Sequence, residues 1–428
     1  MLIPAAARIN GELEFTGDKS ISHRLVLLSL LNRGQFEITG LSNCRDVKSS
    51  IDAVSQLGVE VSDSNGVILL QNPGIPSRQG HFNINCGNSG TTARLLSGIL
   101  AGQPGFYRLY GDTSLSLRPM QRIIGPLAAM NANISASANQ LLPIEISGNR
   151  FLRAIDFNNQ TGSAQVKSAV MLAALQAIGE TTILEQFPGR DHSERLFSRL
   201  NLPFKSIQGG IRVKGPAELS GNHSFVVPGD ISSAAFFITA ASIVPGSKLK
   251  LKNMLLNPDR TGFLQVLKRM GANIKTTLRR EAWEPAGDIL VNSANLTATD
   301  IEAGEIPDLI DELPVLAIAM AFARGTSRVI GARELRHKET DRIRDLIGQM
   351  QIAGISCHEL ADGFEITGPT RISKRPTLDS CNDHRLAMSF AVLALNSEHG
   401  LEIKNSGCID ISFPDFIATL DKCLRAKN

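Results

Sequence analysis

Residues 231–243 read ISSAAFFITAASI, a stretch in which small and aliphatic residues leave no polar face. A helix that is apolar on all sides has to be buried inside a domain. Stretches of the same kind recur along the chain, where they begin at Ser20, Ser89, Ala164, Ile231, Glu312 and His384. Because these starts are about 70 residues apart, they predict six repeated units, each built around one buried helix.

A second helical segment with apolar residues on one face follows each buried helix, as in SERLFSRLN (193–201). This pattern predicts an amphipathic helix at the surface of the unit. Five of the six segments run through Gly or Asn into a strand, as in LGVEV (57–61) and MGANI (270–274). Such a small residue suits the left-handed end of a helix, so each unit contributes an inner helix, an outer helix and strands.

The units divide into two groups of three at the Pro-Gly-Asp junction of residues 228–230. A leading strand over 8–15 precedes the first unit, and the sixth unit ends after its outer helix. We therefore expect the N-terminal segment to complete the last unit, which makes one domain of 17–228 and a discontinuous one of 1–16 with 229–428. An open row of six units, a solenoid, is the alternative.

The composition excludes several classes of protein. Apolar residues are 43% and charged residues 20% of the 428 residues, which is typical of a globular chain. Aromatic residues are 5%, too few for platforms that stack single-stranded nucleic acid. The formal charge of +3 is too balanced for nucleic-acid binding by bulk charge, so any anion site has to be local.

The sequence predicts no cofactor, no metal site and no membrane segment. None of the cysteines forms a CxxC pair, which favours reduced thiols, and RDHSER (190–195) lacks a third spaced ligand for a metal. Neither GxxxxGK[ST] nor GxGxxG occurs between a strand and a helix. The start of the chain shows no secretory leader and no run of about 20 apolar residues occurs, so we expect a cytoplasmic protein.

Polar and basic residues gather where the first three buried helices begin. The motifs GDKSISHR, NCGNSGTTAR and GSAQVKS contribute Lys19, Ser20, Arg24, Asn88, Gly90, Thr91, Arg94, Ser163, Gln165 and Lys167. A helix N-terminus presents unpaired N–H groups, so it favours a phosphate or a carboxylate, although an N-cap is the plainer interpretation of any single motif. Arg24, Arg94 and Lys167 lie within apolar helices and need an anionic ligand or a buried carboxylate.

Charged residues are densest in the second half of the chain. RHKETDRIRD (336–345) packs four charged candidates into one predicted helix start, and further charges precede the last two buried helices. The residues concerned are Asp311, Glu312, Lys338, Glu339, Asp341, Arg342, Asp383, His384 and Arg385. A solvated helix face with i, i+4 pairs is the plainer interpretation of such a run, and a polyanionic ligand is the other.

Taken in order along nearly the whole chain, these motifs resemble the 5-enolpyruvylshikimate-3-phosphate synthase family, the 3-phosphoshikimate 1-carboxyvinyltransferases. The motifs that carry the resemblance are GDKSISHR, GNSGTTAR, GDTSLSLRPM, SAQVKSA, RDH, DELP, HKETDR, NDHR and SFPDF. The resemblance implies an α/β fold of two domains, an inside-out α/β barrel in which each domain has three βαβαββ units around buried parallel helices. We also expect a monomer.

The resemblance implies a reaction as well. The enolpyruvyl group of phosphoenolpyruvate would be transferred to the 5-hydroxyl of shikimate 3-phosphate by addition and elimination, with release of phosphate, in a cleft that closes between the domains. This reaction serves the shikimate pathway, which leads to aromatic amino acids. The alternative is UDP-N-acetylglucosamine 1-carboxyvinyltransferase, which usually has Lys-Asn where this chain has Lys19 and Ser20. A repeat scaffold that binds partners without catalysis would leave the set of Lys and Arg residues unexplained.

Site residues follow from the resemblance residue by residue. Shikimate 3-phosphate would be held by Lys19, Ser20, Arg24, Ser163, Ala164, Gln165, Arg190, Asp311 and Lys338. Phosphoenolpyruvate would be held by Lys19, Asn88, Gly90, Arg118, Gln165, Arg342 and Arg385. The resemblance makes Asp311 the candidate proton acceptor, with Lys19 sharing that position. Glu339 or Lys338 is the candidate proton donor, and His384 is a further candidate.

Three positions can be compared with the residues that relatives of this family have. Ile411 stands where many relatives have Lys, and Ala164 stands where others have Ser, a combination that looks like the second sequence class of the family. Gly90 is retained where glyphosate-insensitive relatives have Ala. The resemblance therefore predicts inhibition by glyphosate, which occupies the phosphoenolpyruvate position.

Overall fold

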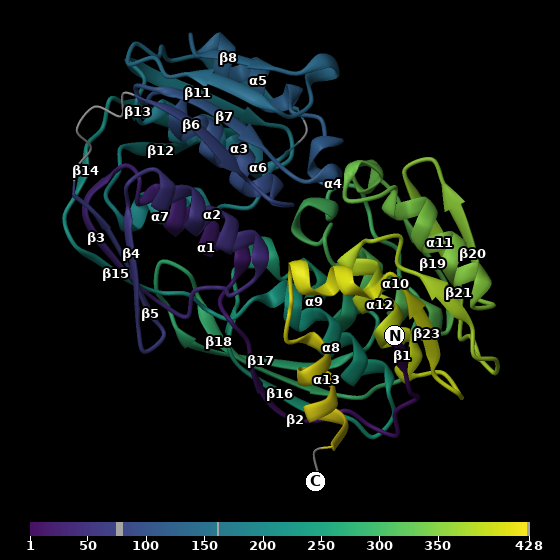
Figure 1. Ribbon diagram of the computed structural model, residues 1–428. Coiled ribbons are helices and arrows are strands. Elements are labelled where there is room, and N and C mark those ends of the chain that lie inside the picture. The colour runs from purple at the N-terminus through teal and green to yellow at the C-terminus, as the bar shows by residue number, and fades with distance from the viewer. Residues whose placement is uncertain (74–79, 161, 426–428) are drawn as a thin grey trace. The chain divides into compact units, whose positions relative to one another are not determined.

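The computed structural model describes residues 1–73, 80–160 and 162–425. The chain divides into two compact units. Unit 1 is Met1–Phe15 with Pro228–Asn428, and unit 2 is Thr16–Val227. Figure 1 labels many of the helices and strands of both units along the purple-to-yellow course of the chain.

Unit 2 contains, among the described residues, three buried helices, three outer helices and three sheets. The buried helices are α1 (Lys19–Leu28), α3 (Gly90–Leu100) and α6 (Ala164–Ala174), and the outer helices are α2 (Arg45–Gln56), α5 (Gln121–Ala129) and α7 (His192–Arg199). Its sheets have the orders β14-β3-β5-β4 with β15 beside β3, β6-β7-β9-β8, and β10-β11-β13-β12. The strand bounds are β3 (Asn32–Thr39), β4 (Glu60–Ser64), β5 (Val67–Asn72), β6 (His81–Asn85), β7 (Phe106–Tyr110), β8 (Asn133–Ala136), β9 (Ile144–Ser147), β10 (Asp156–Asn159), β11 (Gly179–Glu185), β12 (Phe204–Ile207), β13 (Gly210–Gly215), β14 (Leu219–Ser220) and β15 (His223–Val226), and the short helices are α4 (Thr113–Ser116) and η1 (Ala138–Gln140).

Unit 1 repeats this plan within its described part. The buried helices are α8 (Ile231–Ile243), α10 (Leu313–Phe322) and α12 (His384–Leu395), and the outer helices are α9 (Gly262–Arg269), α11 (Arg342–Ile352) and α13 (Phe416–Arg425). Its sheets have the orders β17-β18-β16-β2, β19-β21-β20 and β1-β23-β22. The strand bounds are β1 (Leu2–Ile3), β2 (Asn10–Glu14), β16 (Lys248–Leu255), β17 (Asn273–Arg280), β18 (Ala286–Asn292), β19 (Gly325–Val329), β20 (Ser356–Leu360), β21 (Gly363–Gly368), β22 (Thr377–Asp379) and β23 (Leu401–Lys404), and the short helices are η2 (Pro258–Arg260), η3 (Ile306–Asp308), η4 (Arg333–His337) and η5 (Ser406–Ile411).

The six buried helices confirm the repeat predicted from the sequence. All residues of α12 are buried, and the helix has the predicted bounds of 384–395. Each fully buried Leu or Phe on such a helix contributes about 1.5–3 kcal/mol relative to an exposed one. The outer helix α2 instead buries one face, and Gly58 beyond its end has a φ of 89°. This left-handed conformation costs glycine little, as the pattern predicted.

The N-terminal strands correct one detail of the expected topology. We expected the N-terminal segment to complete the last unit, and its first strand does so, but its leading strand β2 pairs in parallel with β16 of another sheet (Figure 1). The contact with the last unit is made by the shorter β1, which pairs antiparallel with β23. The solenoid alternative is wrong, because the chain forms two compact units of three sheets each. The fold is the two-domain inside-out α/β barrel.

The buried helices of unit 2 run in the same direction. At their N-terminal ends, Gln165 Nε2 of α6 donates to Thr91 Oγ1 of α3 at 2.9 Å. At the C-terminal ends, Leu31, Gly102 and Leu175 line one cavity. In unit 1, Ser232 Oγ at the start of α8 donates to Glu312 Oε1 directly before α10, and Arg385 Nη1 of α12 donates to the Asp311 carbonyl. Each unit therefore gathers the N-termini of its buried helices, with their partial positive charge, at one end.

Candidate active site

Lys19 begins α1 in unit 2 and forms an ion pair with Asp46 of α2. The distance from Lys19 Nζ to Asp46 Oδ2 is 2.9 Å, and the two side chains are 22% and 12% exposed. Asp18 caps the helix by accepting a hydrogen bond from the Ile21 N–H at 3.0 Å. The sequence predicted Lys19 and missed Asp46, because the two residues meet only through the packing of α1 against α2. Asp46 fixes the ammonium group beside the helix N-terminus.

The start of α3 carries a second polar cluster. Asn88 Nδ2 donates to Asp112 Oδ2 at 2.7 Å, while Arg118 Nη2 donates to Asn88 Oδ1 at 2.9 Å. Asp112 also caps α4 by accepting from the Leu115 N–H at 2.8 Å. The structure therefore brings together the predicted residues Asn88 and Arg118, and it adds Asp112 as the residue that holds Asn88 in place.

Gln165 links the start of α6 to α3. Its Oε1 accepts from Arg94 Nη1 at 2.8 Å, so Arg94 is directed toward the predicted site rather than into the core. Gly90 lies against the same guanidinium, since a Cβ built at Gly90 would be 2.5 Å from Arg94 Nη1 and 3.6 Å from Arg118 Nη1. The space above Gly90 is thus bounded by two guanidinium groups.

Arg24 is buried and joins three helices of unit 2. Its Nε donates to Ser193 Oγ of α7 at 2.9 Å, and its Nη2 donates to Ser168 Oγ of α6 at 2.7 Å. Its Nη1 donates to the Ser20 carbonyl at 2.9 Å. Arg24 therefore links α1 to α6 and to the start of α7. Helix α7 begins two residues after Arg190.

Three further predicted residues of unit 2 lie at loop ends and helix starts. Ser163 is the N-cap residue of α6, and Ala164 is the first residue of that helix. Arg190 lies two residues before α7, in the loop after β11. The sequence placed Ser163 and Ala164 at the start of a buried helix, as the structure does, whereas Arg190 was named only through the family resemblance.

Arg342 is the centre of the charged cluster in unit 1. Its side chain is 1% exposed, its Nε donates to Asp383 Oδ2 at 2.7 Å, and its Nη2 donates to Glu339. Its Nη1 lies 4.0 Å from Asp311 Oδ1 and has no hydrogen-bond partner among the described residues. Although burial opposes the charged form, the carboxylates of Asp383 and Glu339 raise the pKa of Arg342 above its usual value. The solvated-face interpretation of this charge run is therefore wrong for Arg342.

Asp311 faces two more cations. Lys338 Nζ lies 3.5 Å from Asp311 Oδ1, and Arg385 Nη2 lies 3.9 Å from Asp311 Oδ2. Arg385 also donates to the Asp311 carbonyl at 2.7 Å. The Asp311 side chain remains 17% exposed, so a ligand can reach its carboxylate. Asp311 and the cations around it form a polar site at the start of α10.

Two structural details of unit 1 correct or extend the prediction. Lys338 and Glu339 lie in the connection between η4 and α11 rather than in a helix start, since α11 begins at Arg342. Asp383 was named among the charged candidates but given no substrate contact, and it caps α12 by accepting from the Arg385 N–H at 2.8 Å and anchors Arg342. Its position directly before a buried helix indicates a capping residue. The sequence does not show that the same carboxylate also binds Arg342.

His384 and Ile411 complete the comparison with the predicted site. His384 is the first residue of α12 and is 4% exposed. Ile411 is the last residue of η5. The described residues contain no group of three or more His, Cys, Asp or Glu that could hold a metal ion, and no helix among them is long and apolar enough to span a membrane.

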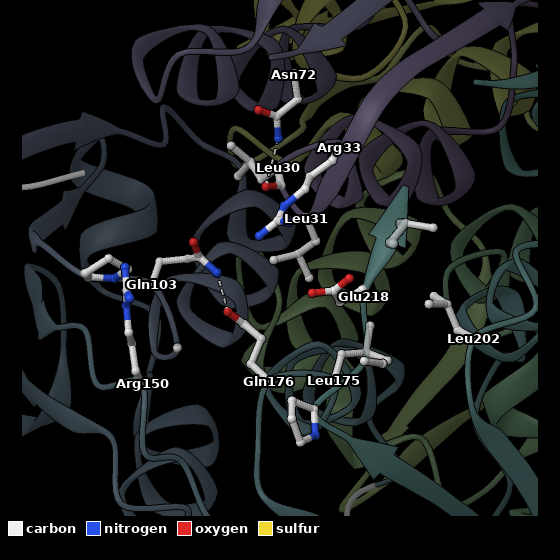
Figure 2. Close-up of a pocket in the computed structure, with 15 residues that line it drawn as sticks. Leu30, Leu31, Arg33, Asn72, Gln103, Arg150, Leu175, Gln176, Leu202 and Glu218 are labelled. Atoms are coloured by element: carbon white, nitrogen blue, oxygen red, sulfur yellow. Dashed lines mark hydrogen bonds between the residues drawn. The ribbon is translucent and has the colours of Figure 1, made fainter. Parts of the chain in front are cut away.

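A cavity of about 540 Å³ lies at the opposite end of unit 2 from Lys19, Asn88 and Gln165. Figure 2 shows Arg33 and Glu218 pointing into it beside Gln103 and Gln176, which are joined by a hydrogen bond of 2.5 Å. The cavity lies at the C-terminal ends of α1, α3 and α6, whereas the predicted residues lie at their N-terminal ends. A cavity of this size is a typical ligand site, but the charged residues that the sequence predicted for unit 2 lie at the other end of α1, α3 and α6.

Comparisons with known proteins agree along nearly the full length. The family described as EPSP synthase (3-phosphoshikimate 1-carboxyvinyltransferase) matches residues 3–420. The 3-phosphoshikimate 1-carboxyvinyltransferase of Citrifermentans bemidjiense is 42% identical over 97% of both chains. The protein of the same name from Synechococcus elongatus is 43% identical over 97% of this chain and 94% of its own.

Solved structures give the same result. EPSP synthase from Acinetobacter baumannii superposes with a TM-score of 0.86 at 35% identity and covers 99% of this chain and 97% of its own. The enolpyruvyl transferase NikO from Streptomyces tendae superposes with a TM-score of 0.79 at 14% identity over 98% of this chain and 96% of its own. The latter likeness shows a shared fold.

Proposed function

Since the chain belongs to the EPSP synthase family of 3-phosphoshikimate 1-carboxyvinyltransferases, we propose that it transfers the enolpyruvyl group of phosphoenolpyruvate to the 5-hydroxyl of shikimate 3-phosphate. The observation that carries this proposal is the buried guanidinium of Arg342, whose Nη1 has no hydrogen-bond partner among the described residues. A buried cationic donor without an acceptor is costly. A carboxylate or phosphate oxygen of a substrate would satisfy it with a charge-assisted hydrogen bond.

The proposed reaction consists of an addition and an elimination. In the addition, the 5-oxygen of shikimate 3-phosphate forms a bond to C2 of phosphoenolpyruvate, its proton passes to a base, and C3 gains a proton. In the elimination, C3 loses a proton, the double bond between C2 and C3 forms again, and phosphate leaves with the electron pair of its bond to C2. The net products are the enolpyruvyl ether and one inorganic phosphate.

Asp311 is the proposed acceptor of the hydroxyl proton. Its partly exposed carboxylate lies within 4.0 Å of Lys338, Arg342 and Arg385, which hold it in one orientation. Lys19 would form a hydrogen bond to the same hydroxyl group of shikimate 3-phosphate. Glu339 or Lys338 would deliver the proton to C3, since Lys338 Nζ lies 3.5 Å from Asp311 Oδ1 and Glu339 accepts from the neighbouring Arg342.

The substrates would divide their contacts between the two units. We assign the phosphate and carboxylate of shikimate 3-phosphate mainly to unit 2, through the residues predicted at the starts of α1, α6 and α7. Phosphoenolpyruvate would be held by Arg342 and Arg385 of unit 1 together with Arg118 and Asn88 of unit 2. Arginine suits this role because its planar fork donates two parallel hydrogen bonds to a carboxylate or phosphate.

Glyphosate is proposed as an inhibitor that takes the phosphoenolpyruvate position. The support is Gly90, above which a Cβ would meet the guanidinium groups of Arg94 and Arg118. Because Gly90 has no side chain, the Arg94 guanidinium can lie against its backbone near Arg118, where an anionic ligand would meet both cations.

An assay of phosphate release tests the proposed function. Purified protein should release phosphate only when shikimate 3-phosphate and phosphoenolpyruvate are both present. Replacing shikimate 3-phosphate by UDP-N-acetylglucosamine should abolish the release. Absence of phosphate release with both proposed substrates would overturn the proposal, and release with the nucleotide sugar would favour the alternative transferase.

A further inference from the structure

Lys167 is a buried lysine of α6 whose ammonium group is fully engaged. Its side chain is 2% exposed, and its Nζ lies 2.6 Å from Glu194 Oε1 and 2.9 Å from Glu185 Oε2. It also donates to the Gly189 carbonyl at 2.9 Å. An ammonium group has three hydrogens, so these three acceptors account for all of them.

The three acceptors belong to one short segment of unit 2, residues 185–194. Glu185 ends β11, Gly189 lies in the following loop, and Glu194 lies in the first turn of α7. A single cation therefore ties both ends and the middle of this segment to α6. Arg190, the proposed contact for shikimate 3-phosphate, follows Gly189 directly, so Lys167 holds the carbonyl of the peptide bond that joins Gly189 to Arg190.

The same cluster reaches the loop that presents Ser163. Asn159 Nδ2 donates to Glu185 Oε1 at 2.9 Å and to the Ser163 carbonyl at 3.2 Å. Glu185 thus accepts from both Lys167 and Asn159. The loop before α6 and the loop before α7 are joined through one carboxylate.

The electrostatics of the cluster argue against a role in stability alone. Burial opposes the charge on Lys167, yet Glu194 and Glu185 raise the pKa of its ammonium group. Burial raises the pKa of Glu194, although Lys167 opposes this effect. Apolar side chains of similar volume often stabilise a core as well as or better than a buried ion cluster does. We therefore expect the cluster to contribute a fixed geometry rather than added stability.

We propose that Lys167 is a positioning residue for shikimate 3-phosphate. It acts through residues 185–194 and through Asn159, and it places Arg190 and Ser163 without touching the substrate. The inference rests on the proposed function, because it takes Arg190 and Ser163 as contacts of that substrate.

The test is the substitution Lys167→Met, with steady-state kinetics for both substrates. Met keeps the length of the side chain and removes the three hydrogen bonds, so the KM for shikimate 3-phosphate should rise about tenfold or more. Turnover at saturation should stay within about threefold, and the KM for phosphoenolpyruvate should stay within about twofold. Lys214→Met is the matched control, because Lys214 lies exposed on β13 of the same unit. It should leave all three constants unchanged.

The outcomes separate this inference from the proposed function. An inactive wild-type protein would refute the proposed function. An active wild-type protein with an unchanged KM for shikimate 3-phosphate in folded Lys167→Met would overturn the inference alone, as would equal rises in both KM values.

If circular dichroism shows that Lys167→Met does not fold, Glu185→Gln provides the second test. This variant keeps the shape of the side chain and removes its charge. It should raise the KM for shikimate 3-phosphate about threefold or more and leave the KM for phosphoenolpyruvate unchanged. A folded Glu185→Gln protein with wild-type kinetics would overturn the inference.

Discussion

Arg342 carries the strongest residue-level prediction, because its guanidinium is buried between carboxylates and keeps one donor for a ligand. Arg342→Lys retains the charge but loses the planar fork, so kcat/KM for phosphoenolpyruvate should fall about 100-fold, as expected from the loss of one or two charge-assisted hydrogen bonds. Steady-state kinetics measure this fall. Arg344→Lys is the control, since that side chain is 66% exposed on the same helix, and a similar fall there would contradict the prediction.

Gly90→Ala tests the space for the proposed inhibitor. The added Cβ would meet the end of the Arg94 side chain at 2.5 Å, so this flexible group has to move and its hydrogen bond to Gln165 is disturbed. The protein should fold, and the inhibition constant of glyphosate should rise about tenfold or more. Gly348→Ala, where nothing lies within 4 Å of the new Cβ, should leave inhibition unchanged. Equal inhibition of wild type and Gly90→Ala would count against the assignment.

His23 should make the free energy of unfolding depend on pH. Burial lowers the pKa of His23 from 6.5 to about 3, and its Nδ1 lies 2.8 Å from Ser50 Oγ. Between these values the unfolded chain binds a proton that the folded chain excludes. The stability that neutral His23 provides is therefore fully present above pH 6.5 and is lost as pH falls toward 3, by up to about 1.4 kcal/mol per pH unit.

The measurement is urea unfolding of wild type and His23→Asn at several pH values from 7 to 5. Asn retains a polar atom near the position of Nδ1 and does not titrate, so its free energy of unfolding should fall less steeply with decreasing pH. Parallel pH profiles for the two proteins would show that His23 does not carry this dependence.

The sequence predicted the charged residues of the site better than it predicted their partners. Lys19 and Arg342 are recognisable at the starts of their helices, and both lie in the structure with acidic partners. Asp46 was missed, because its pairing with Lys19 exists only once α1 packs against α2. Asp383 was noted before α12, but the sequence could not show that its carboxylate also holds Arg342.

At the level of elements, the close packing of α3 against α6 gives a further prediction. A Cβ at Gly98 would lie 2.1 Å from the backbone oxygen of Ala169, and backbone cannot yield as a side chain does. Gly98→Ala should therefore lower the free energy of unfolding by about 2 kcal/mol or more, measured by urea unfolding. Gly348→Ala in the open interior of α11 should instead stabilise by about 0.5–1 kcal/mol. Equal stability of Gly98→Ala and wild type would disprove the close approach.

Helices were more predictable than strand partners for a physical reason. An apolar run such as α12 specifies its own burial and bounds, since the signal lies within twelve consecutive residues. The partner of β2 is decided by a strand more than two hundred residues away, so β16 could not be identified from the local pattern. The two-residue strand β1 is too short to give any periodic signal.

At the level of the whole molecule, the repeat of about 70 residues accounts for two units of three sheets and three buried helices each. The buried helices contain few aromatic residues, and small residues such as Gly98 allow these helices to approach one another closely. The balanced net charge conceals local groups of cations at helix starts in both units. We propose that a single reaction uses the cations of both units.

The most direct test follows the carbon that forms the new bond. Phosphoenolpyruvate labelled with carbon-13 at C2 is incubated with shikimate 3-phosphate and the protein, and the label is observed by nuclear magnetic resonance. If the protein carries out the proposed transfer, the label appears in an enolpyruvyl ether of shikimate 3-phosphate while one inorganic phosphate is released per ether formed. Label that stays in phosphoenolpyruvate, or that appears as pyruvate, would contradict the proposed transfer.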